Sequence, residues 1–209
     1  MGIFLSMRKK YCVKRFRKIP HEIYNKYDFF ELDDDEFLKR CYILQRCGAG
    51  IVLGRPKEGY DVRIVELEHS RRGVYQNVPL GRFGEICYKT VSGAEFIHTA
   101  LYGFYDQCGR IWCCGPIEKT ATVNDKRYFP YCIEPLFERI WWVASCKFFP
   151  DMSFIGHDGR GVVITTMPAL FRIIPFLKKY FIRRLQRFAD RFPITQDLSI
   201  VINHKKCKR

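Results

Sequence analysis

The sequence lacks any uninterrupted apolar run near the roughly 20 residues that a membrane-spanning helix needs. Its first apolar stretch, Ile3 to Met7, is too short for the apolar region of a secretory signal peptide. We find no internal repeat and no Ser-, Gly- or Pro-rich linker long enough to separate two domains. These absences predict an intracellular protein with one domain, and 209 residues suffice for a hydrophobic core.

Signatures of catalysis are also lacking. There is no Gly-rich phosphate-binding loop, no His-Glu-x-x-His sequence and no pair of carboxylates at an informative spacing. His157, Asp158 and Gly159 are typical of a turn. No local Cys–His pattern identifies a nucleophile with its base. The sequence therefore predicts a protein that is not an enzyme.

Acidic residues are the minority among the charged residues. The chain has 22 Asp and Glu against 36 Lys and Arg, which gives a formal net charge of +14. Such an excess favours a polyanionic partner, whether nucleic acid, an acidic membrane or an acidic protein surface, and it selects none of them. The positive charge is concentrated in residues 8–18, 172–191 and 204–209, whereas residues 31–36 are acidic.

The first 18 residues form a basic arm with a lipidation pattern. Gly2 and Ser6 fit the pattern for attaching myristate to an N-terminal glycine. One acyl chain binds a membrane weakly, so the basic residues, or palmitate on Cys12, supply the second signal that stable anchoring needs. The same basic run is also typical of a nuclear address or a nucleic-acid-binding arm.

Cysteine is plentiful, with ten residues. Without a signal peptide, disulfides are disfavoured and metal ligation is favoured, although free cysteine is also a common small core residue. The best group lies in residues 98–115, where a histidine precedes a cysteine cluster in a Gly-bearing loop. Zinc takes four nitrogen or sulfur ligands, often as close pairs on turns. The expected zinc ligands are Cys41, Cys47, His98, Cys108 and Cys113.

Periodicity and turn residues predict an α+β fold. We expect helices at 33–48, 92–105, 134–149 and 176–192, and strands at 51–54, 60–67, 84–91, 161–166 and 198–203. Ser92 and Glu95 form a capping box at the start of the second helix. Residues 19–209 are expected to form a single domain, in which a few helices pack on short, mostly antiparallel strands and zinc stabilises the fold.

The helix expected at 176–192 has a basic side and an apolar side, as basic amphipathic helices do. Its apolar side carries Leu177, Phe181, Leu185, Phe188 and Phe192. The basic residues recur at four- and seven-residue steps in and before the helix, at Arg172, Lys179, Arg183, Arg187 and Arg191. The pattern suits either an ordinary surface helix or a basic surface that binds a partner, and aromatic residues among basic ones can stack on bases.

Several stretches resemble the adenovirus early region 4 34K protein family. YDFFELDDDEFLKRCYILQRC, FIHTALYGFYDQCGRIWCC and GHDGRGVV resemble, in order, that family's acidic stretch leading into Leu-Arg-Lys-Cys, its Ile-His followed by a cysteine cluster, and its Asp-Gly-His-x-Gly-x-Val-Val stretch. The basic helix near the end matches the family's arginine-faced helix. The resemblance covers about two-thirds of the chain in patches, and residues 54–91 have no counterpart.

The resemblance implies a viral early adaptor in the host nucleus. Family members recruit host elongin B/C and a cullin ubiquitin ligase, in some lineages with a second viral early protein, to degrade host targets. The elongin-binding box of such adaptors is helical, and its nearest match here is YILQRCGAGI, with Ile43, Cys47 and Ile51. Ile43 replaces the usual leucine, and Gly48 and Gly50 disturb the helix.

Two alternatives remain open at this point. One is a myristoylated, polybasic protein on the cytoplasmic face of membranes, which rests on Gly2 and the basic run. The other is a zinc-stabilised nucleic-acid-binding protein without a ligase role, whose binding would weaken steeply with salt.

Overall fold

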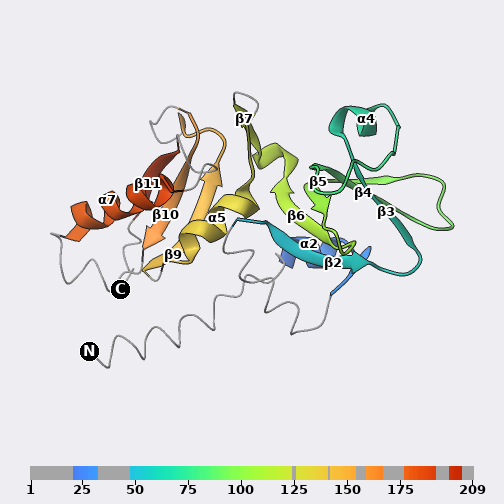
Figure 1. The fold of residues 1–209 in the computed structure, drawn as a ribbon, viewed down its shortest axis with the longest axis horizontal. Helices are drawn as coiled ribbons and strands as arrows, with labels where there is room; N and C mark the ends of the chain where they lie inside the picture. The colour runs from blue at the N-terminus through green and yellow to red at the C-terminus, as the bar shows by residue number, and fades with distance from the viewer. Residues whose placement is uncertain are drawn as a thin grey trace. The chain divides into compact units, whose positions relative to one another are not determined.

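The computed structural model describes residues 21–32, 48–123, 126–140, 142–153, 159–166, 177–191 and 198–203 (Figure 1). The chain divides into two compact units, one within Arg17–Thr120 and the other within Ala121–Arg209. We call them the first unit and the second unit. The helix expected at 33–48 lies outside the described residues.

The first unit is built on a six-stranded sheet in which every paired strand is antiparallel to its neighbour. The strand order is β1-β2-β6-β5-β4-β3. The strands are β1 (Phe30–Glu31), β2 (Ile51–Pro56), β3 (Tyr60–Val65), β4 (Gly84–Thr90), β5 (Ile97–Tyr105) and β6 (Ile111–Pro116). The helices are α2 (His21–Lys26), α4 (Leu67–Arg71) and the short 3-10 helix η1 (Ile117–Lys119).

The link between β2 and β3 forces this sheet to curl. The two strands follow each other in the chain, yet β6, β5 and β4 lie between them in the sheet. In a flat sheet they would stand about 19 Å apart, four strand spacings. The chain from Pro56 to Tyr60 reaches about 14 Å at most. The sheet must therefore bend so that β2 approaches β3.

Aromatic and polar contacts close the curl. The ring of Phe29, just before β1, stacks on Tyr88 of β4 with centroids 4.6 Å apart. Asp28 accepts a short hydrogen bond from the Tyr60 hydroxyl of β3 and lies 3.3 Å from Lys57 Nζ. These contacts join the segment before β1 to β3 and β4, at the other edge of the sheet. We call the Asp28, Lys57 and Tyr60 group the seam.

The helix expected at 92–105 is wrong, because Ile97–Tyr105 is strand β5. The spacing of its apolar residues fits a helix, but β5 lies between β4 and β6 and hydrogen-bonds to both. Pairing on both sides outweighs a local helix signal, since each residue then satisfies its backbone groups in the sheet. Ser92 and Glu95 therefore cap no helix. The strands expected at 51–54, 60–67 and 84–91 are confirmed as β2, β3 and β4.

The second unit contains a two-stranded ribbon, a three-stranded sheet and two helices. The ribbon is β7 (Ala121–Val123) with β8 (Lys126–Tyr128). The sheet order is β11-β10-β9, with β9 at Val143–Phe149, β10 at Gly161–Thr166 and β11 at Ser199–Asn203. The helices are α5 (Pro130–Glu138) and α7 (Leu177–Ala189). β10 and β11 are parallel, which requires a crossover, and α7 lies in it.

One apolar core joins these elements. Ile133 and Phe137 of α5, Phe148 of β9 and Leu185 of α7 are buried together. Phe137 also contacts Phe188 of α7, with ring centroids 5.9 Å apart. Figure 1 shows α5 running beside β9.

The helix expected at 134–149 is only partly correct. α5 begins earlier, at Pro130, and ends at Glu138, after which the chain becomes β9. Pro130 suits a first turn, where its missing N–H costs nothing. The strands expected at 161–166 and 198–203 and the helix expected at 176–192 are confirmed as β10, β11 and α7.

The α+β class with few helices and mostly antiparallel strands is confirmed, with β10–β11 as the parallel exception. Residues 19–209 were expected to be one domain, and no linker in the sequence marks the division at Ala121. Among the described residues, no helix is long and apolar enough to cross a membrane.

Candidate metal centre

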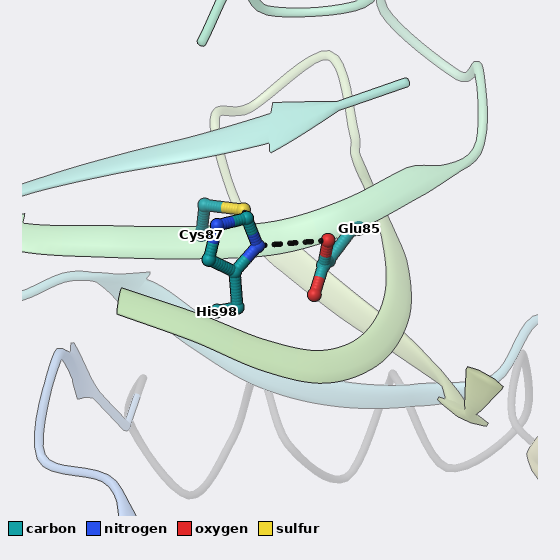
Figure 2. A group of neighbouring side chains, drawn as sticks. All are labelled: Glu85, Cys87 and His98. Atoms are coloured by element: carbon teal, nitrogen blue, oxygen red, sulfur yellow. Dashed lines mark hydrogen bonds and ion pairs between the residues drawn. The ribbon is translucent and has the colours of Figure 1, made fainter. Parts of the chain in front are cut away.

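Glu85, Cys87 and His98 converge on one face of the first unit's sheet, as Figure 2 shows. Glu85 and Cys87 are alternate residues of β4, so their side chains leave the same face of the strand. His98 lies directly opposite Cys87 on β5. One ligand atom from each residue lies within 4.8 Å of the other two.

A bulge in β5 shapes the site. Cys87 pairs with His98 and Glu85 pairs with Tyr102, so β5 has three residues where β4 has only Ile86. Ala100, in this bulge, has φ 57°, a left-handed conformation that a non-glycine residue rarely adopts. Its N–H donates to Glu85 Oε1 at 3.2 Å. The bulge thus aims a backbone donor at the buried carboxylate.

The histidine connects the carboxylate to a tyrosine. His98 Nδ1 lies 3.1 Å from Glu85 Oε2 and 3.8 Å from Cys87 Sγ. His98 Nε2 lies 2.9 Å from the hydroxyl of Tyr75, in the segment after α4. Ser70, in α4, donates its hydroxyl hydrogen to Glu85 Oε2 at 2.7 Å. The segment from α4 to Tyr75 therefore holds both the glutamate and the histidine.

The cluster is open on the side of the histidine. The side chain of Glu85 is 6% exposed, whereas that of His98 is 43% exposed. Burial, and then the negative charge of Glu85, raises the pKa of the Cys87 thiol to about 12. Without a cation, Cys87 therefore stays protonated at neutral pH and is a weak nucleophile. Burial also raises the pKa of Tyr75, with further contributions from Cys87 and Glu85.

His98 is the one predicted zinc ligand in this cluster. Cys108 is exposed in the turn between β5 and β6, and Cys113 is buried in β6. Within the part of the chain that the structure describes, neither belongs to a group of donors that could hold a metal. Cys41 and Cys47 lie outside the described residues.

Sequence reasoning missed Glu85 and Cys87. The signal was present, because the strand predicted at 84–91 places both side chains on one face. It was overlooked because His98 was assigned to a helix, which removed the reason to look for partners on a neighbouring strand.

The other predicted site residues fall in several places. Of the expected elongin-binding residues, Ile51 is fully buried in β2, and Ile43 and Cys47 lie outside the described residues, as does Gly2. Arg183, Arg187 and Arg191 are exposed in or just after α7. Lys179 is in α7, its side chain not described, and Arg172 lies outside the described residues.

No protein family model and no curated protein matches the sequence. The resemblance to the adenovirus early region 4 34K family, the elongin and cullin partners and the nuclear location therefore stay predictions. The fold, by contrast, is similar to that of solved enzymes.

Three solved structures illustrate this similarity. An anthranilate CoA ligase in complex with anthranoyl-AMP matches 76% of this chain with a TM-score of 0.58 and 19% identity. The o-succinylbenzoate CoA synthetase of Bacillus subtilis, in complex with its acyl-adenylate intermediate, matches 88% with a TM-score of 0.60 and 10% identity. ATP-bound MatB of Rhodopseudomonas palustris matches 73% with a TM-score of 0.54 and 14% identity. The chain spans about a third of their lengths, 32%, 36% and 31%.

These matches correct the functional prediction. Two of the three proteins are enzymes by name, a CoA ligase and a CoA synthetase. This finding contradicts the predicted viral early adaptor that recruits a ubiquitin ligase, and it contradicts the prediction that the chain is not an enzyme. Nor does it favour a myristoylated membrane protein or a nucleic-acid-binding protein. At these identities the similarity establishes the fold, and a shared fold does not fix the reaction.

Proposed function

We propose that this chain binds an adenylate, as ATP or an acyl-AMP, in an adenylate-forming ligase reaction. In that reaction a carboxylate oxygen attacks the α-phosphate of ATP, forming an acyl-adenylate and releasing pyrophosphate. The observation that carries the proposal is the fold, which over 73–88% of this chain matches a CoA ligase and a CoA synthetase with bound acyl-adenylates and MatB with bound ATP.

Charge supports the same proposal. A formal net charge of +14 attracts anionic ligands, and ATP, acyl-adenylates and pyrophosphate are all anions. Because the chain spans about a third of the matched ligases, adenylate binding and the complete reaction are separate expectations.

Calorimetric titration of the full chain with ATP and with a non-hydrolysable acyl-adenylate analogue tests the binding. We expect saturable binding with one ligand per chain and tighter binding of the analogue. Pyrophosphate exchange into ATP with a panel of carboxylic acids tests the reaction. Absence of saturable binding for both ligands would overturn the proposal.

A matched control separates a site from general attraction to positive charge. Arg183 and Arg187 are exposed on α7, so replacing both with glutamine lowers the charge without touching a core residue. A specific adenylate site should keep its affinity in this variant. Binding that falls together with the charge, or that GTP and CTP reproduce equally, would show attraction to polyanions only.

Zinc is a second proposal, favoured by one specific observation. Glu85, Cys87 and His98 supply oxygen, sulfur and nitrogen atoms, the three donor types that zinc accepts. We infer that the chain holds zinc and that the ion stabilises the first unit. Protein purified without chelator should contain about one zinc per chain by elemental analysis, and chelation should lower its melting temperature. A metal-free preparation with unchanged stability in added zinc would contradict this proposal.

A further inference from the structure

We propose that Glu85, Cys87 and His98 form a zinc site with an open fourth position, which takes a water molecule or, in its place, a small anion or thiolate. The inference rests on the zinc proposal and is independent of adenylate binding. It goes further by identifying the ligands, the atoms that orient them and the reactive character of the site.

The donor distances suit a tetrahedral ion. With zinc bonds of about 2.0–2.1 Å to nitrogen, 2.0–2.2 Å to oxygen and 2.3 Å to sulfur, tetrahedral ligands stand about 3.4 Å (N to O) and 3.6 Å (N to S) apart. His98 Nδ1 lies 3.1 Å from Glu85 Oε2 and 3.8 Å from Cys87 Sγ. Shifts of a few tenths of an ångström bring these two distances to zinc values. The ligand atoms of all three residues lie within 4.8 Å of one another, so rotation of the Glu85 or Cys87 side chain must supply the remaining approach.

Two of the proposed ligands, His98 and Glu85, already make the additional hydrogen bonds that usually orient metal ligands. A zinc-bound histidine commonly donates its other N–H to an oxygen, and a ligating carboxylate is itself hydrogen-bonded. Tyr75 supplies the oxygen at His98 Nε2, 2.9 Å away. Ser70 bonds Glu85 Oε2, and the Ala100 N–H bonds Oε1. This arrangement leaves a lone pair on Oε2 for the ion once the His98 hydrogen bond is replaced.

Zinc binding should fix the tautomer of His98. With Nδ1 as the zinc ligand, the imidazole proton sits on Nε2 and donates to the Tyr75 oxygen, 2.9 Å away. The Cys87 thiol binds the ion as a thiolate, so its proton leaves to solvent when zinc binds.

The exposure of the histidine indicates an open site. Structural zinc sites have four protein ligands, whereas three protein ligands plus water are typical of catalytic zinc. Within the described residues the donor group contains three members. The 43% exposed side chain of His98 leaves a path from solvent to the ion. The fourth ligand is then exchangeable, and a small anion or thiolate competes with water.

Cobalt substitution tests the ligands and the open position in the full chain. Co²⁺ should give the visible bands of a tetrahedral ion and a sulfur-to-cobalt charge-transfer band. Cys87→Ser should abolish the charge-transfer band. Azide or 2-mercaptoethanol should shift the visible bands of the wild-type protein. If neither ligand changes the spectrum, the site is closed and the open position is wrong.

The positioning role of Tyr75 has its own readout. Tyr75→Phe should weaken zinc binding about 10- to 100-fold, the usual cost of losing such a partner, while the charge-transfer band persists. Tyr24→Phe, at a 57% exposed tyrosine in α2, is the matched control and should bind zinc as the wild type does. Nitrogen-15 NMR of His98 should show a metal-bound Nδ1 and a protonated Nε2 when zinc is added.

The outcomes distinguish the proposal that the chain binds zinc from the proposal that zinc binds at this site. If the wild type holds no zinc, the zinc proposal fails and this site fails with it. If the wild type holds one zinc and His98→Ala or Cys87→Ser holds it equally well, zinc binds elsewhere and only this site is wrong. Urea unfolding of each variant confirms that a lost ion does not reflect a lost fold.

Discussion

Each unit of the molecule buries a glutamate, and the two glutamates have different polar neighbours. Glu85 of the first unit is 5% exposed and Glu134 of the second unit is 4% exposed. Both accept a backbone N–H, from Ala100 at 3.2 Å and from Phe148 at 3.1 Å. A buried carboxylate without such donors would cost several kcal/mol, on the order of a broken ion pair.

The two carboxylates differ in their other polar contacts. Glu85 lies beside the hydroxyl of Ser70 and the imidazole of His98, in a cluster with Cys87. Glu134 faces Lys147, whose Nζ lies 3.9 Å away and whose side chain is 64% exposed. Equal burial therefore does not indicate equal function. The neighbouring donor types decide whether a buried carboxylate can take part in metal chemistry.

The largest expected difference between the two glutamates is in zinc binding, and it is tested by replacing each with glutamine in a separate variant. Glu85→Gln should weaken zinc binding by at least about 100-fold, because an amide oxygen is a poor substitute for a carboxylate ligand. Glu134→Gln should leave zinc affinity unchanged. Competition with a chromophoric chelator measures both. Equal losses in the two variants would mean that the effect is general and that Glu85 is not a ligand.

A change in stability should single out Glu134. Glu134→Ala leaves the buried Phe148 N–H without its acceptor and should lower the free energy of unfolding by about 1–3 kcal/mol. Lys147→Ala removes only an exposed ion pair and should change it by about 0.5 kcal/mol or less. Urea unfolding provides both values. If the lysine variant is the less stable of the two, the ion pair matters more than the backbone bond.

The strained bulge residue offers a smaller effect of opposite sign. The left-handed conformation of Ala100 costs about 1–2 kcal/mol, whereas glycine adopts it freely. Because glycine also gains about 0.5–1 kcal/mol of freedom in the unfolded chain, Ala100→Gly should raise stability by about 1 kcal/mol or less. Ala121→Gly, at a buried position of β7, should lower stability instead. Thermal unfolding of the two variants compares them, and destabilisation by Ala100→Gly would argue against strain.

The smallest expected effect is a pH dependence at the seam. The hydrogen bond from Tyr60, and then the one from Lys57, lowers the pKa of Asp28. A carboxylate whose pKa is lower in the folded state stabilises the fold above its unfolded value of about 3.9. That contribution is lost as the pH falls through the lower, folded value.

Tyr60→Phe should therefore be slightly less stable than wild type at neutral pH, and the difference should shrink as the pH falls below about 3.9. Urea unfolding at neutral pH and at a series of acidic pH values measures the difference. Tyr24→Phe serves as a control whose difference from wild type, if any, should not vary with pH. A Tyr60→Phe difference that persists in acid would assign the contribution to packing and not to the carboxylate.

Both units were predictable in part from the sequence. The strands β2, β3 and β4 of the first unit, and α7, β10 and β11 of the second, were identified because their patterns are regular and agree with their environment. The helix expected at 134–149 included residues that form β9. The strand β5 was mistaken for a helix, because its apolar spacing fits a helix and only its pairing with β4 and β6 decides otherwise.

The candidate site was predictable only through His98. The other expected ligands were chosen by nearness in the sequence, as with Cys108 and Cys113. The observed partners of His98 lie 11 and 13 residues away and meet it through strand pairing and a bulge. Sequence spacing cannot reveal a register, so Glu85 and Cys87 required the structure.

The glutamates of α5 have a consequence beyond stability. β9 is an outer strand of its sheet, and such strands present backbone donors that another chain can use. The N–H groups of Cys146 and Phe148 are instead taken by Glu138 at 3.2 Å and Glu134 at 3.1 Å. These two side chains occupy donors that an added strand would need, so a strand could pair with β9 at these positions only by displacing them.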